Sequence, residues 1–414
     1  MNKHIYFYRN LIWQYLLQAI KYILPLLTLP YLTRVLQPEG YAVVAYVTAF
    51  MTFVQVFVDF GFNLSGTKRV AAAQGDATEA GKVAGTITQA RLLLCTAAGA
   101  VVAVVAALLP ITRENPAYVA LAYLAVCGRA LAPDFLFQGN EDMGPLTTRY
   151  LVSKGTSTAL TFVLVRSPAD LLWVPALDIL ASAVALAWSF SAARRRFGVR
   201  PVRVPLRESL AELRVSGLYG LSNMASVVFT GFTTLLVGVV ADAREVDYWS
   251  LSATAVSAVQ SLFAPIVNSL YPHMVKGADL SFARRIALLA AAPLLLGTAA
   301  FALLSRPIMA VLGGDAYMGG AGVLVWVSPV LPLSFYAMLL GWPVLGAFGR
   351  VGAVTRSTVA SALFCIASLL ALSAAGCAAL PAICAARCAT EAVLCGMRAW
   401  SCRGLLLGRA RVGR

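Results

Sequence analysis

The chain has 414 residues, of which 60% are hydrophobic and only 12% are charged. Soluble domains typically carry about 25% charged residues, so this composition excludes an ordinary soluble protein and indicates a polytopic membrane protein. The formal net charge of +15 raises the alternative of nucleic-acid binding, but the positions of the charges, described below, explain it without a nucleic-acid partner.

Apolar stretches close to 20 residues long recur along the whole chain, and this length is enough to cross about 30 Å of hydrocarbon. The sequence therefore predicts an all-α fold with about twelve transmembrane helices. The expected spans are residues 11–34, 41–65, 86–109, 116–137, 146–165, 171–193, 213–240, 247–271, 285–304, 321–345, 355–375 and 379–400.

The first span contains two prolines, Pro25 and Pro30, and it ends at Arg34. A proline inside a helix removes a backbone hydrogen bond and clashes with the preceding turn, at a cost of about 3 kcal/mol. Two such prolines in one apolar stretch predict either a hinge or a static kink that serves packing. Broken backbone at this depth is tolerated where it faces protein or a water-filled cavity.

Positive charges divide unequally between the two sides of the predicted topology. With a cytoplasmic N-terminus, 24 of the 33 lysines and arginines lie on the cytoplasmic side, and this number includes Arg91, Arg149 and Arg398. Five lie on the other side, one in each loop, and four lie inside spans. Because cytoplasmic loops are typically rich in lysine and arginine, both termini are expected in the cytoplasm.

The longest polar connector, "RRRFGVRPVRVPLRE", runs from Arg194 to Glu208 and separates six predicted spans from six. The sequence therefore predicts two six-helix lobes around a central cavity, an N-terminal lobe of residues 1–205 and a C-terminal lobe of residues 206–414. An even number of spans in each half gives both halves the same orientation.

Signatures of enzymes and cofactors are not apparent in the sequence. The eight cysteines include no CxxC pair, and there are only two histidines. The glycines between 313 and 322 are not followed by a lysine at the spacing of a phosphate-binding loop. We expect no catalytic residue, metal or cofactor. If this membrane protein moves a solute, a proton or sodium gradient is the candidate energy source for that movement.

Several segments, in order, resemble the polysaccharide-transport branch of the MOP flippase superfamily, which also contains the multidrug (MATE) exporters. They are "LTLPYLTRVLQPEGY", "VDFGFNLSGTKRVA", "APDFLFQGNEDM", "VDYWSLSATAVSAVQSLFAPIVNSLYPHM" and "LGWPVLGAFGR". Together they cover roughly residues 5–360, and the last fifty residues match poorly. The chain departs from the usual pattern at Gln37, Ala42 and Asp247, where glycine is common, and at Phe135, where tryptophan is common.

The resemblance implies a Wzx-type flippase that moves undecaprenyl-diphosphate-linked oligosaccharides to the outer leaflet of the bacterial inner membrane by alternating access. Such a protein serves the synthesis of O-antigen, capsule or exopolysaccharide. The implied partners are this lipid-linked substrate, the lipid bilayer, and the polysaccharide polymerase and chain-length machinery. In this branch the first span is a bent helix beside the cavity, a role that suits Pro25 and Pro30.

Ionisable residues inside predicted spans are costly and therefore usually face a cavity or a partner. Lysine and arginine provide matched partners for phosphate oxygens, so the sequence predicts a diphosphate site at the cations Lys21, Arg34, Arg129 and Lys154. The alternative is that each cation forms a structural ion pair with a neighbouring carboxylate, for example Arg129 with Asp134. Asp59 and Asp178 are candidate sites for a coupling ion.

Two other functions remain open at this point. A MATE-like drug or ion antiporter would be expected to have an anionic cavity, whereas this chain places cations in its spans. A membrane-embedded polysaccharide polymerase would usually carry a large external loop, and no predicted external loop exceeds about fifteen residues.

Overall fold

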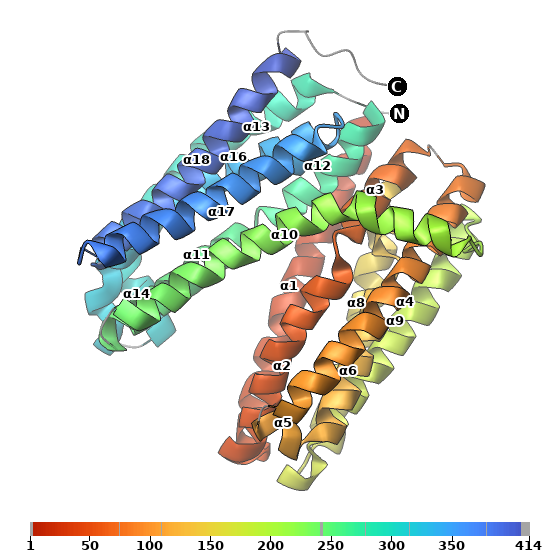
Figure 1. The fold of residues 1–414 in the computed structure, drawn as a ribbon, viewed down its shortest axis with the longest axis horizontal. Coiled ribbons are helices and arrows are strands. Elements are labelled where there is room, and N and C mark those ends of the chain that lie inside the picture. Colours follow the sequence, from red (N-terminus) through yellow and green to blue (C-terminus); the bar gives the residue numbers. More distant parts are fainter. Residues whose placement is uncertain are drawn as a thin grey trace. The chain divides into compact units, whose positions relative to one another are not determined.

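The structure is a computed structural model that describes residues 3–73, 75–108, 110–240, 243–277, 279–313, 315–377 and 379–406. Every regular element in this part of the chain is helical (Figure 1), which confirms the predicted all-α class. Each predicted span falls on one helix or on consecutive helices. The chain divides into two compact units, residues 1–220 and 221–414, and the helix α10 (Leu206–Val240) begins in the first unit and ends in the second.

The first unit contains two clusters of buried apolar side chains. One includes Phe62 and Phe135, and the other includes Val47 and Val126. The helices that contribute to the unit, besides the start of α10, are α1 (Lys3–Val35), α2 (Gln37–Asp59), α3 (Phe62–Ala72), α4 (Ala77–Leu108), α5 (Pro110–Glu114), α6 (Pro116–Ala130), α7 (Asp134–Gly139), α8 (Gly144–Leu164), the 3-10 helix η1 (Pro168–Asp170) and α9 (Trp173–Phe197).

The second unit is built around one cluster of buried residues that includes Trp249, Leu324 and Ile383. Its elements after α10 are α11 (Ala243–Ser261), α12 (Ala264–Gly277), α13 (Leu280–Leu303), α14 (Ser305–Gly313), the 3-10 helix η2 (Asp315–Gly320), α15 (Ala321–Val327), α16 (Val330–Leu339), the π-helix η3 (Leu340–Gly346), α17 (Val351–Ala374) and α18 (Leu380–Leu406).

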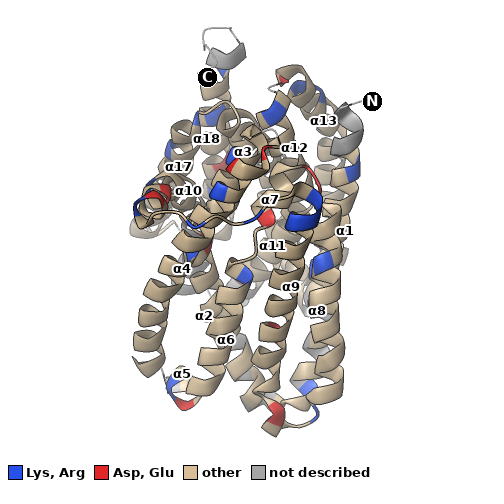
Figure 2. Cartoon of the chain, turned by 90° about the vertical axis from the view of Figure 1, so that its right-hand side faces the viewer, with Lys and Arg blue, Asp and Glu red and all other residues tan. Residues whose placement is uncertain are grey.

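Eight helical stretches among the described residues are long and apolar enough to cross a membrane, and a ninth is a pair bent by 44° between Val327 and Val330. These nine coincide with nine of the predicted spans. The other three predicted spans lie on α1, α8 and α10. Figure 2 shows the charged residues as isolated positions on helices that are otherwise uncharged, as expected for helices in a bilayer.

The motif "DFGFNLSGT" joins the second predicted span to the start of α10 within the first unit. Gly61 has a φ of +77°, and a Cβ on it would lie 2.5 Å from Cβ of Tyr219. Ser65 donates a hydrogen bond to Glu212 (3.2 Å), and Arg69 forms an ion pair with the same carboxylate at 2.5 Å. Glycine permits both the left-handed backbone and the close approach, so the motif fixes the first turns of α10 against α3.

Three arginines that the sequence analysis counted on the cytoplasmic side are buried within helical units. Arg91 of α4 is 1% exposed, Arg149 of α8 is 7% exposed and Arg398 of α18 is 6% exposed. Each donates hydrogen bonds to carbonyl, amide, hydroxyl or carboxylate oxygens inside its unit. Without these three arginines, the predicted division of charge is twenty-one cations against five, and the side of the membrane on which they lie stays a prediction.

Candidate functional site

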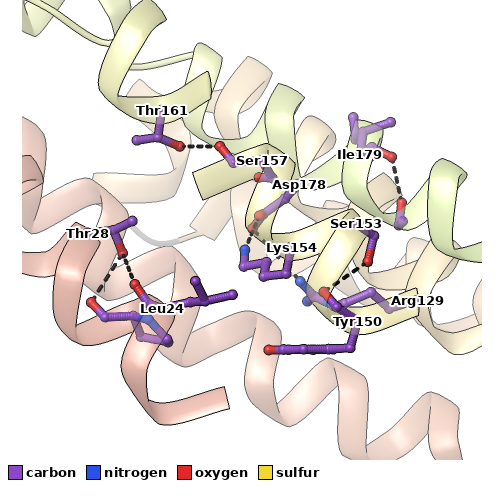
Figure 3. A network of polar contacts seen from close by, with 12 residues as sticks. Leu24, Thr28, Arg129, Tyr150, Ser153, Lys154, Ser157, Thr161, Asp178 and Ile179 are labelled. Atoms are coloured by element: carbon purple, nitrogen blue, oxygen red, sulfur yellow. Dashed lines mark hydrogen bonds and ion pairs between the residues drawn. The ribbon is translucent and has the colours of Figure 1, made fainter. Parts of the chain in front are cut away.

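Asp178 of α9 lies between two cationic side chains from neighbouring helices of the first unit. Its Oδ1 accepts a short hydrogen bond from the ammonium of Lys154 on α8, and its Oδ2 lies 3.9 Å from Nη1 of Arg129 on α6. Figure 3 shows both cationic groups pointing toward the carboxylate. Helices α6 and α8 both pack on α9, which explains how residues nearly fifty positions apart meet at one carboxylate.

A polar chain extends from Arg129 toward α2. Nε of Arg129 lies 3.5 Å from Oε1 of Gln55, and Gln55 donates from Nε2 to Oδ1 of Asp59 at 3.1 Å. Gln55 and Asp59 are four residues apart and therefore share one face of α2. The two carboxylates predicted for ion coupling, Asp59 and Asp178, are thus connected through one arginine and one amide.

Lys21 lies on α1, and its Nζ is 5.7 Å from the ring centroid of Tyr150 on α8, within the range of a cation–π contact. Tyr150 and Lys154 are one helical turn apart on α8, and Figure 3 shows Tyr150 beside Arg129 and Lys154. In the described part of the structure, no ion pair or hydrogen bond joins the Lys21 side chain to another residue. Its side chain is exposed.

Arg34 does not join this group. It is an exposed residue in the last turn of α1, thirteen positions beyond Lys21. At 1.5 Å per residue, that separation is about 20 Å along the helix. The structure therefore joins Arg129 and Lys154 through Asp178, and it places Lys21 against Tyr150 of α8, one helical turn from Lys154. Arg34 lies apart from them.

Both prolines of α1 lie within one helix that runs from Lys3 to Val35. Pro25 lacks the N–H that would bond to the carbonyl of Lys21, and Pro30 lacks the one that would bond to the carbonyl of Leu26. Thr28 donates its hydroxyl to the carbonyl oxygens of Leu24 (3.3 Å) and Pro25 (3.1 Å), as Figure 3 shows. The side chain of Pro30 lies outside the described part of the structure.

The alternative that the cations pair with neighbouring carboxylates is confirmed for Arg129 and Lys154, which both pair with Asp178. Only the example of Asp134 as the partner of Arg129 is wrong. Asp134 pairs with Arg149, whose Nη1 lies 2.5 Å from Oδ1 and also donates to Ser189 at 2.8 Å. The side chain of Arg149 is only 8% exposed and that of Asp134 is 28% exposed.

Sequence reasoning missed Gln55 and Tyr150 as parts of the site. The spacing of Gln55 to Asp59 and of Tyr150 to Lys154, four residues in each case, would have indicated a shared helix face. Sequence spacing alone does not show that α2, α6, α8 and α9 present these faces to one another.

The resulting group is a partly exposed cluster of three cations and one directly paired carboxylate. The side chains of Arg129, Lys154 and Asp178 are 47%, 31% and 30% exposed. Lysine and arginine supply only hydrogen-bond donors. The compact ammonium of lysine and the planar guanidinium of arginine both suit the oxygens of a phosphate or diphosphate. Among the described residues, no group of three histidine, cysteine, aspartate or glutamate residues is placed to hold a metal.

Comparison with known protein families identifies the chain's relatives. A family model described as "Polysaccharide biosynthesis protein" matches residues 7–278, well over half of the sequence. The chain belongs to this family. The resemblance predicted from the sequence is thereby confirmed.

Two curated relatives carry the name "Putative O-antigen transporter". The protein from Escherichia coli K12 is 25% identical over 266 residues, which make up 64% of each chain. The protein from Shigella dysenteriae is 27% identical over 272 residues, 65% of this chain and 67% of the relative. The chain thus aligns with about two thirds of the length of each relative.

Solved structures of MATE and related transporters share the fold over nearly the whole chain. MATE in the straight conformation gives a TM-score of 0.82 at 13% identity, and MATE in the bent conformation gives 0.81 at 12%, each covering 99% of this chain and 98% of that one. A MOP superfamily transporter from Pyrococcus furiosus, described as having a binding pocket of reverse polarity, gives a TM-score of 0.81 at 12% identity, with the same coverage of both chains. The protein therefore has the all-helical, polytopic fold of the MOP superfamily.

Proposed function

We propose that this protein is a flippase for undecaprenyl-diphosphate-linked oligosaccharides. It carries the repeat unit from the cytoplasmic to the outer leaflet of the bacterial inner membrane by alternating access, for O-antigen, capsule or exopolysaccharide synthesis. The observation that carries this proposal is the cluster of Lys21, Arg129 and Lys154 within a member of the polysaccharide biosynthesis family. The names of the two curated relatives support the substrate class.

In this proposal the three cations bind the diphosphate, which is common to all substrates of this class, while the sugar varies. The substrate carries about two negative charges on its diphosphate. A site with three cations and one paired carboxylate is electrically matched to it, and both lysine and arginine bind phosphate oxygens well. A drug exporter for cationic compounds would require the opposite charge at this position, so the cluster disfavours that alternative.

We also propose that α1 is a hinge. Pro25 frees the carbonyl of Lys21, so the residue that contacts the substrate lies one turn from a weakened position in the helix. MATE, which shares this fold, has been solved in a straight and in a bent conformation, and this supports a change of conformation within the fold. A bend at Pro25 would move Lys21 relative to Tyr150 on α8. Asp59 and Asp178 are the candidate residues for coupling such a change to a proton or sodium gradient.

The direct test is flipping in proteoliposomes. The purified protein is reconstituted with a fluorescent undecaprenyl-diphosphate sugar, and the fraction of label accessible to a membrane-impermeant quencher is followed in time. We expect flipping by the wild type and none by the variant that carries Lys21→Gln, Arg129→Gln and Lys154→Gln. A wild type that fails to flip this lipid but extrudes organic cations would instead support the antiporter function, and formation of longer glycans would support a polymerase.

The same preparation tests the orientation. With both termini in the cytoplasm, a cysteine placed at Arg200 should be labelled only from the cytoplasmic side, and cysteines at Arg244 and Arg306 only from outside. External labelling at Arg200 would contradict the predicted topology.

A further inference from the structure

Asp178 pairs with two of the three cations of the candidate site, Lys154 and Arg129. One carboxylate oxygen accepts from Lys154, and the other faces Arg129 at 3.9 Å. In the described structure these are the only ion pairs of Lys154 and Arg129. A diphosphate that binds to the two cations must therefore share them with Asp178 or displace it.

The cations of the group are more exposed than the arginine of the ion pair nearby. The side chains of Arg129 and Lys154 are 47% and 31% exposed, whereas Arg149 is 8% exposed and donates a further hydrogen bond to Ser189. The two carboxylates are alike, since Asp178 is 30% and Asp134 is 28% exposed. A partly exposed pair is worth little, typically below about 1 kcal/mol, so an incoming anion can replace it. A pair whose arginine is buried and makes a further hydrogen bond is harder to break.

The chemistry of the two anions is alike at the point of contact. A carboxylate presents two acceptor oxygens, and each phosphate group of a diphosphate presents several, so both compete for the same N–H donors. We propose that Asp178 is a resident counter-ion of the diphosphate site. It pairs with Lys154 and Arg129 when the site is empty, and the diphosphate displaces it from these cations on binding. When Asp178 pairs with the cations again, the substrate dissociates. This inference rests on the proposed function.

Two consequences follow for a transporter. The cations are kept from attracting other cellular anions, because any ligand must displace a fixed carboxylate that is already in place. The substrate is also bound less tightly than three free cations would bind it, which favours release at the other leaflet. Asp178 is thus a residue that sets affinity and release, and it does not itself hold the substrate.

The test compares Asp178→Asn with wild type for binding of farnesyl diphosphate, a short isoprenoid diphosphate, by calorimetry in detergent. Farnesol is the ligand control. Asp142→Asn is the matched control variant, because Asp142 also pairs with an arginine, Arg196 at 2.8 Å, but lies outside the cluster. We expect Asp178→Asn to bind farnesyl diphosphate roughly three- to thirtyfold more tightly, since two partly exposed ion pairs no longer compete, and to flip the lipid-linked sugar more slowly.

The outcomes separate this inference from the proposed function. If the wild type binds farnesyl diphosphate and Lys154→Gln loses that binding, but Asp178→Asn binds no more tightly than Asp142→Asn, the counter-ion role is wrong and the function stands. If the wild type does not bind farnesyl diphosphate and Lys154→Gln does not change that result, the proposed function itself fails.

A measurement on the unmodified protein covers the case in which Asp178→Asn does not fold. A lipid-soluble carbodiimide modifies carboxyl groups that no cation holds, and peptide mass spectrometry reads the extent at each aspartate. Farnesyl diphosphate should increase modification at Asp178 severalfold and leave Asp134, held by Arg149, unchanged. Equal modification of Asp178 with and without the ligand would show that the diphosphate does not displace it, and the proposal would be abandoned.

Discussion

Replacement of Lys21 by glutamine removes a positive charge from the site while keeping side-chain length and polarity. Among the described residues Lys21 has no ion-pair partner, and its ammonium lies 5.7 Å from the ring centroid of Tyr150. The folded protein should lose only the cation–π contact, about 0.5–1 kcal/mol at an exposed position. A hydrogen bond between the ammonium and a phosphate oxygen is worth about 1.5–3 kcal/mol, which corresponds to a loss of affinity of roughly ten- to 150-fold.

The assay is calorimetric binding of farnesyl diphosphate, followed by flipping of the labelled lipid-linked sugar in proteoliposomes at equal protein content. Lys21→Arg should keep most of the binding, because a single-point contact accepts a guanidinium in place of an ammonium. Lys82→Gln is the control, since Lys82 is an exposed lysine that pairs with Glu79 away from the site. If Lys21→Gln is folded and binds the diphosphate as tightly as the wild type, Lys21 is not part of the site and the three-cation account is wrong.

Three further changes test the hinge in α1, the left-handed backbone at Gln37 and the packing of α3 on α10. Pro25→Ala should leave farnesyl diphosphate binding unchanged and slow flipping severalfold, since it restores a helical hydrogen bond to α1; equal flipping rates would indicate a static kink. Gln37, with a φ of +59°, should gain about 1 kcal/mol of stability when replaced by glycine and none when replaced by alanine, measured as thermal unfolding in detergent. Glu212→Gln should lower the free energy of unfolding by about 1–2 kcal/mol, because the buried carboxylate is hydrogen-bonded and paired with Arg69. The control Glu79→Gln, at an exposed ion pair, should change it by less than about 0.5 kcal/mol. Equal effects of the two variants would mean that the contact of α3 with α10 adds little stability.

The helices could be located from the sequence because hydropathy and length are local properties. Each predicted span coincides with one helix or with consecutive helices. Arg387 and Glu391, four residues apart on α18, form an ion pair at 2.8 Å, as their spacing on one helix face allows. The departure at Gln37 from the usual glycine also has a structural counterpart, since its backbone is left-handed. Features of this kind depend on a few adjacent residues and are readable without knowledge of the tertiary fold.

The candidate site was only partly predictable, because its geometry depends on which helix faces meet. Lys21, Arg129, Lys154 and Asp178 were identified by the cost of a charge inside a span. The same argument grouped Arg34 with them, although it lies about 20 Å from Lys21 along α1. Position within one helix is fixed by residue number, and this separation could have been worked out from the sequence once an unbroken helix was assumed.

The partners of the buried arginines could not be obtained in that way. Arg91 donates to the carbonyl of Ala132 and to Asn63, and it lies 5.7 Å from the ring centroid of Phe62. Arg398 donates to the carbonyl of Ala337 and to the hydroxyl of Thr358. Neither contact set contains a carboxylate, so no pairing rule based on charge would find it.

Hydrogen-bond geometry therefore separates two classes of arginine and lysine that look identical in the sequence. Buried cations such as Arg91 and Arg398 donate to carbonyl, amide and hydroxyl groups of their own unit, so their removal would leave buried acceptors unpaired. Arg129 and Lys154 are partly exposed and share the single carboxylate of Asp178, and Arg129 also lies near Gln55. A partly exposed cation whose one ion pair can be exchanged is available for an anionic substrate. For this reason we assign substrate binding to the exposed cluster and a structural role to the buried arginines.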